Sequence, residues 1–225
     1  RLMRAEGLAR VGMLASGVAH EINNPIGVIA ASADYLLRYQ PGDVAEIQEE
    51  VAAIQREAMR CKEIVQQMLT YANPRPIGKV AVDICALNDE VLSFVLPPSR
   101  ESRFETVREY DPERPLIEAD PNLLKQALLN LYLNAKQAFE EGQPGRIVAR
   151  VLKSDRGRAV RIEIEDNGRG IVDDDMEKIF QPFFTRKAKG TGLGLAVTQR
   201  IVEAFEGSIS VERAQPKGAI FILEF

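Results

Sequence analysis

The chain contains one histidine, His20, and its neighbours in the sequence could support nucleophilic chemistry. An imidazole that attacks phosphorus must be neutral, and it benefits from a carboxylate that holds its second N–H group. Glu21 directly follows His20 and could supply that carboxylate. Pro25 would remove a backbone hydrogen bond one turn further on and bend a helix beside the histidine. A solvated surface histidine is the ordinary alternative, but this combination favours a phosphate-accepting nucleophile.

The apolar pattern on either side of His20 predicts the helix that carries it. Apolar residues spaced three and four apart run from Leu8 to Leu36 and indicate a helix over about residues 4–38. In the heptad that this spacing defines, His20 takes the outward-facing f position. Asn24 takes position c, one turn further along, so both side chains should lie on the same outward face.

A second apolar pattern predicts a long helix over residues 44–72, with alternating a and d positions at Val44, Ile47, Val51, Ile54, Ala58, Cys61, Val65, Met68 and Ala72. Asp43 should cap its start, with Glu46 completing a capping box. A turn at 39–43 would join the two helices as an antiparallel hairpin. Because two helices alone cannot shield all of their apolar faces, we expect residues 1–73 to form a homodimer with a four-helix bundle.

The rest of the sequence changes to patterns that predict a mixed α/β domain. The proline-containing residues 74–79 indicate a linker, and the domain would span residues 80–225. Alternating apolar residues predict strands near 80–84, 147–151 and 160–164, and a hairpin of strands between 209 and 225. Helices are expected at about 86–96, at 121–140 with Asp120 as N-cap, and at 191–206. The stretch from 166 to 192 would be a long loop, and loops of this length are usually functional.

Two of these elements could bind a nucleotide. Asn130 and Asn134 would share one face of a helix, and amide oxygens suit a Mg²⁺ ion that bridges phosphates. Asp166 ends a predicted strand and could accept a hydrogen bond from the 6-amino group of adenine. Gly168 and Gly170 would let the base approach the backbone. Taken singly, the alternatives are surface asparagines on a helix and an ordinary D-N-G-x-G turn.

A glycine-rich segment before the helix at 191–206 could hold phosphates. Backbone N–H groups at a helix N-terminus form an anion site, and here they would come from Gly190, Thr191, Gly192, Leu193 and Gly194. Just upstream, Thr185, Arg186 and Lys187 place two cations within reach of such phosphates. Glycine also simply terminates helices, so this segment alone is a weak signal.

Composition excludes several classes of protein. The 225 residues are 45% hydrophobic and 28% charged, which excludes a disordered or fibrous chain. The net charge of −4 has no basic surplus, so no nucleic-acid partner is expected. No apolar run approaches the ~18 residues of a membrane span. Cys61 and Cys85 lie in unrelated surroundings, so we expect a cytoplasmic chain in a reducing compartment, without membrane contact of its own.

The segment Ala19-His20-Glu21-Ile22-Asn23-Asn24-Pro25 resembles the H box of sensor histidine kinases of the HisKA type. In order and spacing, the later asparagine, D-N-G-R-G, F-Q-P-F-F and glycine-rich segments resemble the N, G1, F and G2 boxes of the GHKL ATP-binding fold. The resemblance covers about residues 8–225. It implies an α + α/β fold class: a long antiparallel helical hairpin, a four-helix bundle in the dimer, followed by an α/β sandwich ATP-binding domain.

The resemblance further implies an ATP-dependent protein-histidine kinase of a two-component system. His20 would accept the γ-phosphoryl group with Glu21 as hydrogen-bonding base, and would pass it to an aspartate of a response-regulator receiver domain. Asn24 would orient water when the regulator is dephosphorylated. ATP and Mg²⁺ would be the cofactors, with Asn134 as the metal ligand. The nucleotide would be bound by Asn130, Asn134, Asp166, Gly168, Gly170, Thr185, Arg186, Lys187, Gly190, Thr191, Gly192, Leu193 and Gly194.

Two features depart from the family pattern. Many members carry a lysine where this chain has Gln137, with Lys136 one place earlier, and the lid between Phe184 and Gly190 is short. A rival interpretation is a GHKL ATPase or serine/threonine-protein kinase whose hairpin only dimerises. Such a protein needs no histidine at an exposed heptad position beside a glutamate, so His20 and Glu21 argue against it. A degenerate, non-enzymatic scaffold is a third possibility, against which the intact nucleotide motifs argue.

Overall fold

The structure is a computed structural model that describes residues 2–39, 43–72, 78–97, 103–140, 142–153, 160–187 and 190–225. The side chains of residues 1–16, 18, 20 and 39 lie outside this description. The chain divides into two compact units. The hairpin unit consists of Arg1–Asn73 with Pro182–Leu193, and the nucleotide unit consists of Pro74–Gln181 with Gly194–Phe225.

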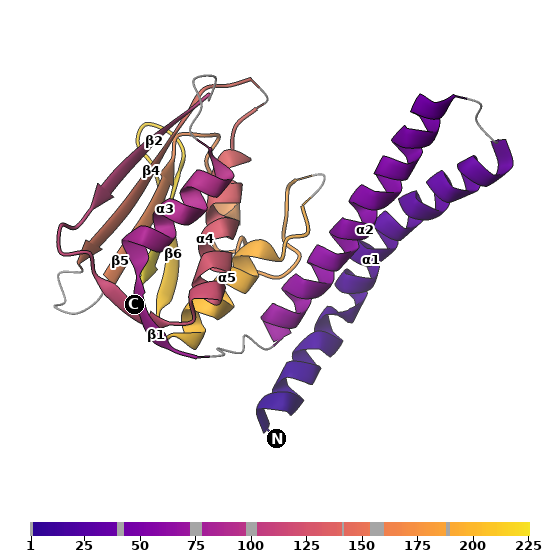
Figure 1. The fold of residues 1–225 in the computed structure, drawn as a ribbon. Coiled ribbons are helices and arrows are strands. Elements are labelled where there is room, and N and C mark those ends of the chain that lie inside the picture. The colour runs from indigo at the N-terminus through magenta and orange to yellow at the C-terminus, as the bar shows by residue number, and fades with distance from the viewer. Residues whose placement is uncertain are drawn as a thin grey trace. The chain divides into compact units, whose positions relative to one another are not determined.

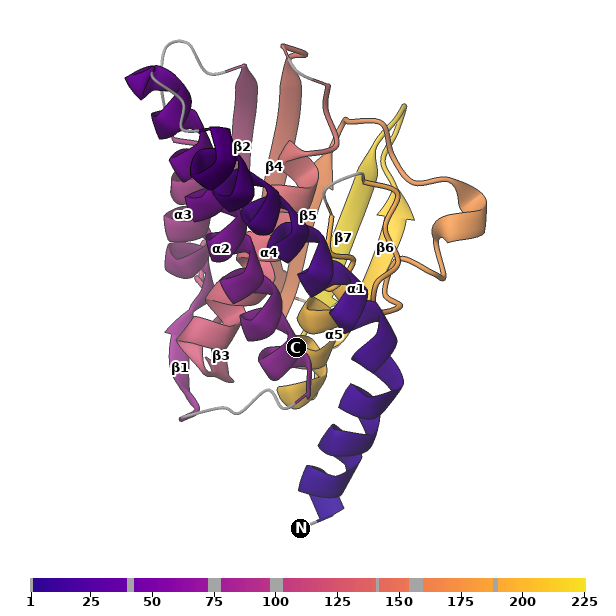
Figure 2. The same ribbon diagram turned by 90° about the vertical axis from the view of Figure 1, so that its right-hand side faces the viewer.

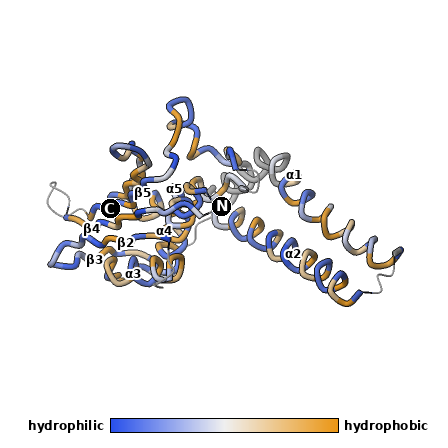
Figure 3. The backbone as a smooth tube through the Cα atoms, turned by 90° about the horizontal axis from the view of Figure 1, so that it is seen from above, coloured by the Kyte–Doolittle hydropathy of each residue, from blue (hydrophilic) through white to orange (hydrophobic). Residues whose placement is uncertain are grey.

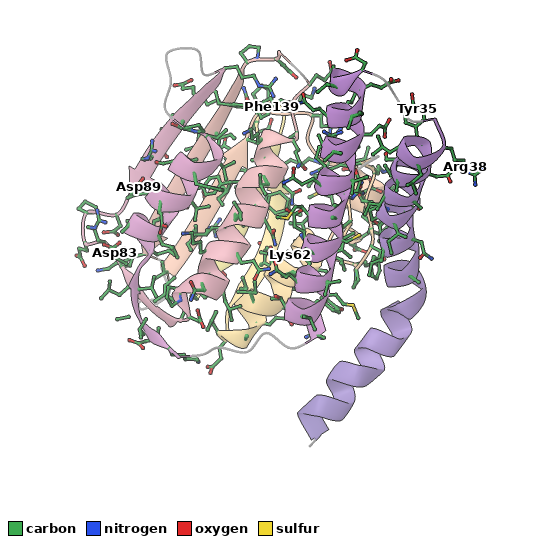
Figure 4. The ribbon with its side chains drawn as sticks, turned by 45° about the vertical axis from the view of Figure 1, so that its right-hand side comes forward. Tyr35, Arg38, Lys62, Asp83, Asp89 and Phe139 are labelled. Carbon is green, nitrogen blue, oxygen red and sulfur yellow. The ribbon has the colours of Figure 1, made fainter. Side chains whose placement is uncertain are left out.

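The hairpin unit is built on two long antiparallel helices, α1 (Leu2–Tyr39) and α2 (Val44–Ala72), which pack along each other (Figure 1). Asp43 caps α2 as expected, because its carboxylate accepts a hydrogen bond from the Ala45 N–H at 2.9 Å. Glu46 accepts a hydrogen bond from the Tyr35 hydroxyl and so links the two helices. Figure 4 shows Tyr35 and Arg38 near the end of α1. Helix α1 is continuous through Pro25 and is bent within its length in the same view.

Helix α2 packs only part of its apolar surface against α1. Ile64, which is not among the predicted a and d positions, is 0% exposed. The predicted a positions Val44, Val51 and Val65 are 66%, 51% and 41% exposed in the single chain. Figure 3 shows hydrophobic residues recurring among hydrophilic ones along the whole of α2. The apolar stripe is therefore wider than one partner helix covers.

The nucleotide unit contains a five-stranded sheet of order β2-β4-β5-β7-β6, covered on one face by three helices (Figures 1 and 2). Strands β2 and β4 are parallel, and the other neighbouring pairs are antiparallel. Strands β1 and β3 form a separate antiparallel pair. The elements are β1 (Val80–Asp83), α3 (Ile84–Val95), β2 (Phe104–Tyr110), β3 (Leu116–Ala119), α4 (Pro121–Lys136), β4 (Gly145–Lys153), β5 (Val160–Asp166), η1 (Asp173–Asp175), α5 (Gly194–Ala204), β6 (Ser208–Arg213) and β7 (Ala219–Glu224).

The alternation in β5 explains why the sheet has one apolar and one polar face. Ile162 and Ile164 are buried under the helices, whereas Glu163 and Glu165 lie on the opposite face. There the guanidinium of Arg150 on β4 pairs with Glu165 at 2.6 Å and with Glu163 at 3.4 Å. The polar face of the sheet thus carries ion pairs between neighbouring strands. The core lies on the other face, between the sheet and α3, α4 and α5.

The predicted fold class is confirmed, and the boundaries of several elements differ from those expected. Ile84 begins α3 and does not extend β1, because the Asp83 carboxylate accepts the Ala86 N–H at 3.0 Å and caps the helix. Helix α4 ends at Lys136, four residues before the predicted 140. Phe139 leaves the helical path and packs edge-to-face on Phe104, with ring centroids 5.3 Å apart.

The sequence patterns also missed two strands, β2 and β3. Strand β2 carries polar residues on both faces, and β3 has four residues, so neither shows a clear alternation. Helix α5 begins at Gly194 and not at the predicted 191, because the preceding glycine-rich residues form a loop. Among the described residues, no helix combines the length and the apolar character that crossing a bilayer requires.

Candidate active site

The predicted phosphoacceptor group lies on helix α1. His20 is within the helix, and its side chain lies outside the described residues. Glu21 is half-buried, and Asn24 is exposed, as its predicted heptad position requires. Pro25 is buried at the next position. The helix thus turns Asn24 outward and buries the proline ring beside it.

Helix α4 positions the two asparagines of the predicted nucleotide site. Asp120 caps the helix, as predicted, by accepting the N–H groups of Asn122 at 2.9 Å and Leu123 at 3.4 Å. The opposite face of α4 is anchored in the core by its buried residues Leu124, Ala127, Leu128, Leu131, Tyr132 and Ala135. Asn130 and Asn134, four residues apart, are both half-buried and therefore share the face that is not fully packed.

Asn130 connects α4 to the start of α5. Its amide nitrogen donates hydrogen bonds to the Gly194 carbonyl at 3.0 Å and to the Thr198 hydroxyl at 3.3 Å. The Thr198 hydroxyl in turn donates to the Gly194 carbonyl at 2.9 Å. Two segments that the sequence analysis treated separately are thereby joined by one hydrogen-bonded group. Thr198 itself was missed, because a threonine inside a helix gives no signal of such a contact.

Lys136 does not point toward a phosphate site. Its ammonium group donates a hydrogen bond to the Val95 carbonyl at 2.9 Å, at the C-terminus of α3. Gln137 is the C-cap of α4, and its backbone N–H bonds to the Leu133 carbonyl at 3.0 Å. Lys136 therefore ties α4 to α3.

The Asp166 loop follows β5 and is held in place at several points. The Asp166 carboxylate is almost fully buried, with the residue 2% exposed, and accepts the Gly168 N–H at 2.9 Å. The side-chain oxygen of Asn167 accepts the Arg146 N–H at 2.7 Å, which fixes the loop to the start of β4. The Arg169 N–H donates to the Ala138 carbonyl at 3.1 Å, just beyond α4. This loop therefore holds a buried carboxylate at the end of β5, in the position that the sequence analysis predicted for adenine recognition.

Glycines leave the space in which this loop fits. A Cβ atom on Gly168 would lie 2.6 Å from the Ala138 Cβ atom. Gly170 adopts φ +74°. Gly218, in the turn between β6 and β7, adopts φ +124°, and a Cβ there would lie 1.8 Å from the Asp166 carbonyl oxygen. The sequence indicated only a hairpin between 209 and 225, and the close approach of Gly218 to Asp166 appears only in three dimensions.

The lid segment Pro182–Leu193 belongs to the hairpin unit. It closes on itself through the Phe183 N–H, which donates to the Gly192 carbonyl at 3.0 Å. Gly192 adopts φ +65°, and a Cβ there would meet the Phe183 backbone at 2.4 Å. The Thr191 hydroxyl donates to the Gln67 side chain on α2 at 3.0 Å, and the Thr185 hydroxyl accepts the Lys187 N–H at 3.0 Å.

These residues fit a magnesium nucleotide by their chemistry. Asp166 is a buried acceptor that bonds the Gly168 N–H, and the glycines beside it carry no side chain that would block a planar base. The described residues contain no group of three or more His, Cys, Asp or Glu that could hold a metal by themselves. Amide oxygens such as those of Asn130 and Asn134 suit a Mg²⁺ ion that keeps phosphate oxygens and water among its ligands.

Comparison with known families agrees with both parts of the chain. Residues 10–76 match the family described as "His Kinase A (phospho-acceptor) domain". Residues 119–225 match "Histidine kinase-, DNA gyrase B-, and HSP90-like ATPase". His20 lies within the first match, and Asn130, Asn134 and Asp166 lie within the second.

Individual relatives span nearly the whole chain. The "Sensor histidine kinase ZraS" of Escherichia coli O157:H7 is 40% identical over 222 residues, 99% of this chain and 47% of the relative. The "Signal transduction histidine-protein kinase AtoS" of Escherichia coli (strain K12) is 41% identical over 224 residues, 99% of this chain and 36% of the relative. The chain thus spans about half or less of the length of these relatives.

Solved structures give the same result. Histidine kinase ThkA, crystallised in complex with response regulator protein TrrA, has a TM-score of 0.80 and 30% identity, covering 99% of this chain and 63% of that one. The separate catalytic domain of ThkA has a TM-score of 0.59 and 33% identity, covering 66% of this chain and 95% of that one. With both family matches, full-length similarity and a shared fold, this chain belongs to the sensor histidine kinases and comprises their phosphoacceptor and ATPase domains.

Proposed function

We propose that this chain uses ATP to phosphorylate its own His20 and then transfers the phosphoryl group to an aspartate of a response-regulator receiver domain. The observation that carries the proposal is that the only histidine of the chain lies within the phosphoacceptor-domain match, while the same chain holds the ATPase domain. The crystallised complex of ThkA with the response regulator TrrA supports the class of partner.

In the proposed transfer, a ring nitrogen of His20 forms a bond to the γ-phosphorus while the bond from that phosphorus to the bridging oxygen of ADP breaks. Glu21 accepts the N–H of the second ring nitrogen and stabilises the positive charge that develops on the imidazole. The protein contributes positioning and charge stabilisation more than covalent chemistry. The phosphoryl group then passes from His20 to a carboxylate oxygen of the partner, which regenerates the neutral imidazole.

The predicted nucleotide-binding residues would orient the ATP. Asp166 accepts a hydrogen bond from the adenine amino group and would repel the carbonyl of guanine. Asn134, with Asn130 beside it, would hold Mg²⁺ through amide oxygens and bound waters, and the ion would neutralise charge on the phosphates. Backbone N–H groups and cations of the lid and the glycine-rich segment hold the phosphates; these are Thr185, Arg186, Lys187, Gly190, Thr191, Gly192, Leu193 and Gly194.

We also propose that the chain acts as a homodimer through residues 1–73. The support is the exposed part of the apolar stripe on α2, where Val44, Val51 and Val65 recur every seven or fourteen residues. On α1, Ile26 and Leu37 are exposed as well. A second hairpin would cover these side chains in a four-helix bundle.

A regulator phosphatase activity is the further part of this proposal. Asn24 is exposed one turn beyond His20, where its amide could orient a water for attack on a phosphoaspartate. Orienting water needs a hydrogen-bonding side chain but no nucleophile. In Asn24→Ala the rate of regulator dephosphorylation should therefore fall much more than the rate of His20 labelling. Equal dephosphorylation rates with and without Asn24 would remove this role and leave the kinase proposal intact.

The test of the kinase proposal is incubation of the purified chain with ATP labelled in the γ-phosphate. We expect a label that is stable in alkali and lost in acid, as phosphoramidates are. His20→Gln should carry no label and should still bind ATP, which shows that its nucleotide unit is intact. An acid-stable label, or a labelled His20→Gln variant, would favour the serine/threonine-kinase alternative and overturn the proposal.

A further inference from the structure

Thr198 occupies an unusual position in the nucleotide unit. It lies on α5, it is 0% exposed, and its hydroxyl bonds both to its own helix and to another one. The hydroxyl donates to the Gly194 carbonyl at 2.9 Å, four residues earlier, which is the ordinary bond of a threonine inside a helix. The same oxygen lies 3.3 Å from the side-chain nitrogen of Asn130 on α4, and this second contact is not explained by helix formation.

The single proton of the hydroxyl determines how Asn130 is oriented. Because Thr198 donates that proton to Gly194, its oxygen can only accept from Asn130. The Gly194 carbonyl, 3.0 Å from the same amide nitrogen, is also an acceptor. Two acceptors therefore face one side of the amide, and a flipped amide would place its oxygen against both of them. The two N–H bonds are satisfied on α5, and the amide oxygen is left for another partner.

We propose that the Thr198 hydroxyl is a positioning group for the nucleotide site: it holds the amide of Asn130 so that its oxygen is presented to Mg²⁺ and its bound waters. The proposal rests on the proposed function of Asn130 in binding magnesium nucleotide. Asn134, one turn along the same helix face, presents the second amide. The lone pairs of an amide oxygen attract Mg²⁺ and the waters bound to it, whereas an amide NH₂ group repels the cation. Without the hydroxyl, one N–H of Asn130 loses its acceptor, and only the Gly194 carbonyl still opposes a flipped amide.

The test compares Thr198→Val, which keeps the shape and removes the hydroxyl, with Thr198→Ser, which keeps the hydroxyl. Calorimetry would measure the affinity of each variant for adenylyl imidodiphosphate, once with Mg²⁺ and once with EDTA. Thr70→Val is the matched control, because the Thr70 hydroxyl also bonds to the carbonyl four residues earlier, at 3.0 Å to Gln66. Thermal unfolding of every variant would show which of them are folded.

We expect Thr198→Val to weaken binding with Mg²⁺ by about 3- to 10-fold, the effect of one lost hydrogen bond. Binding in EDTA should change by less than about twofold, because the hydroxyl acts through the metal-facing amide. Thr198→Ser and Thr70→Val should bind like the original chain. If Thr198→Val does not fold, Thr198→Ala is compared with Thr198→Ser in the same way.

Two results would overturn the positioning role. One is equal weakening with and without Mg²⁺, and the other is Thr198→Ser behaving like Thr198→Val. A chain that binds the nucleotide but does not label His20 would contradict the proposed kinase function and leave the role of Thr198 standing. Normal labelling of His20, together with unchanged Mg²⁺-dependent binding in Thr198→Val, would contradict the role of Thr198 and leave the kinase proposal standing.

Discussion

The helical hairpin and the nucleotide unit differ in what they leave uncovered. On α2, large apolar side chains such as Val44 and Val51 are exposed, although they recur at the spacing of a helix seam. In the nucleotide unit, polar side chains such as Asn88, Asp166 and Thr198 are buried instead. Throughout the described part of the chain, each buried side-chain nitrogen or oxygen has a hydrogen-bond partner. The exposed valines of α2 recur along one helix, which supports the proposed homodimer, whereas exposed apolar side chains of the nucleotide unit such as Phe94 and Leu116 lie on different elements.

A buried chain of hydrogen bonds shows how polar side chains inside the nucleotide unit are paired. The Tyr132 hydroxyl donates to the Asn88 side-chain oxygen at 2.6 Å, and the Asn88 nitrogen donates to the Tyr110 hydroxyl at 3.3 Å. The Tyr110 hydroxyl donates in turn to the Asp89 carboxylate at 3.0 Å. Asp89 lies on α3 and is labelled in Figure 4. Burial raises the pKa of Tyr132, so its hydroxyl keeps the proton that it donates. The chain joins α4, which carries the two asparagines, to α3 and β2.

The largest effect that separates the two units is expected from Gly218→Ala. Its φ is +124°, and a Cβ atom there would lie 1.8 Å from the Asp166 carbonyl oxygen, so a methyl group has no room. The free energy of unfolding of the nucleotide unit should fall by about 3 kcal/mol, and nucleotide affinity should fall with it. Urea unfolding measures the first quantity and calorimetry the second.

Gly142→Ala is the matched control for this experiment. Gly142 also has a positive φ, +80°, but a Cβ there meets nothing within 4 Å. Its substitution should cost about 1 kcal/mol, the effect of the backbone conformation alone. A Gly218→Ala variant no less stable than Gly142→Ala would show that the contact with Asp166 is not a structural constraint.

The hairpin should respond in the opposite way when Val51 and Val65 are both changed to Glu. Two carboxylates in a dimer seam lose water without gaining partners, so the dimer should weaken by about 100-fold or more. Sedimentation velocity would then show monomers, with ATP binding unchanged. Gln55→Glu adds a charge at an exposed position of α2 outside the apolar stripe and should stay dimeric. A dimeric double variant would move the interface away from this stripe.

A smaller effect is expected from Asp166→Asn. The variant replaces a carboxylate that only accepts hydrogen bonds by an amide that can also present a donor to the base. Affinity for ATP should fall by roughly 10- to 100-fold, as when a charge-assisted hydrogen bond is lost. The ratio of the affinity for ATP to that for GTP should become smaller. The exposed Asp174→Asn serves as control for the change in charge. Unchanged affinity in Asp166→Asn would mean that the adenine binds elsewhere.

The smallest effect concerns acid stability at the start of α3. The Ala86 N–H, followed by the Arg114 guanidinium, lowers the pKa of Asp83 below its usual 3.8. A lowered pKa in the folded state means that Asp83 stabilises the fold above the unfolded value and that this contribution is lost as the pH falls through the folded value. Asp83→Ala should therefore cost about 1 kcal/mol at neutral pH.

Urea unfolding as a function of pH would test this prediction. The free energies of unfolding of Asp83→Ala and of the original chain should approach each other as the pH falls below about 4, where the Asp83 carboxyl of the original chain becomes protonated. Asp83→Asn keeps a capping side chain and loses the ion pair with Arg114, so it should lie between the two. A difference that is constant across this pH range would exclude a charged cap.

The sequence by itself determined the features that depend on neighbouring residues. The bounds of α2, the caps at Asp43 and Asp120, and the outward position of Asn24 follow from periodicity and capping, which residues within a few positions encode. The family motifs around His20 and Asp166 could likewise be recognised, because each is a short continuous segment of the sequence. The roles of Asn134 at the metal and of the lid cations at the phosphates stay predictions.

Tertiary structure alone decided the features that join distant parts of the chain. Asn130 meets Thr198 across 68 residues, and Gly218 lies against the carbonyl of Asp166. Strands β2 and β3 show little alternation of their own, and β2 takes its place in the sheet by pairing with β4. In each case the partner is set by how the core packs, because hydrogen bonds and close contacts depend on positions in space that no short window of sequence contains.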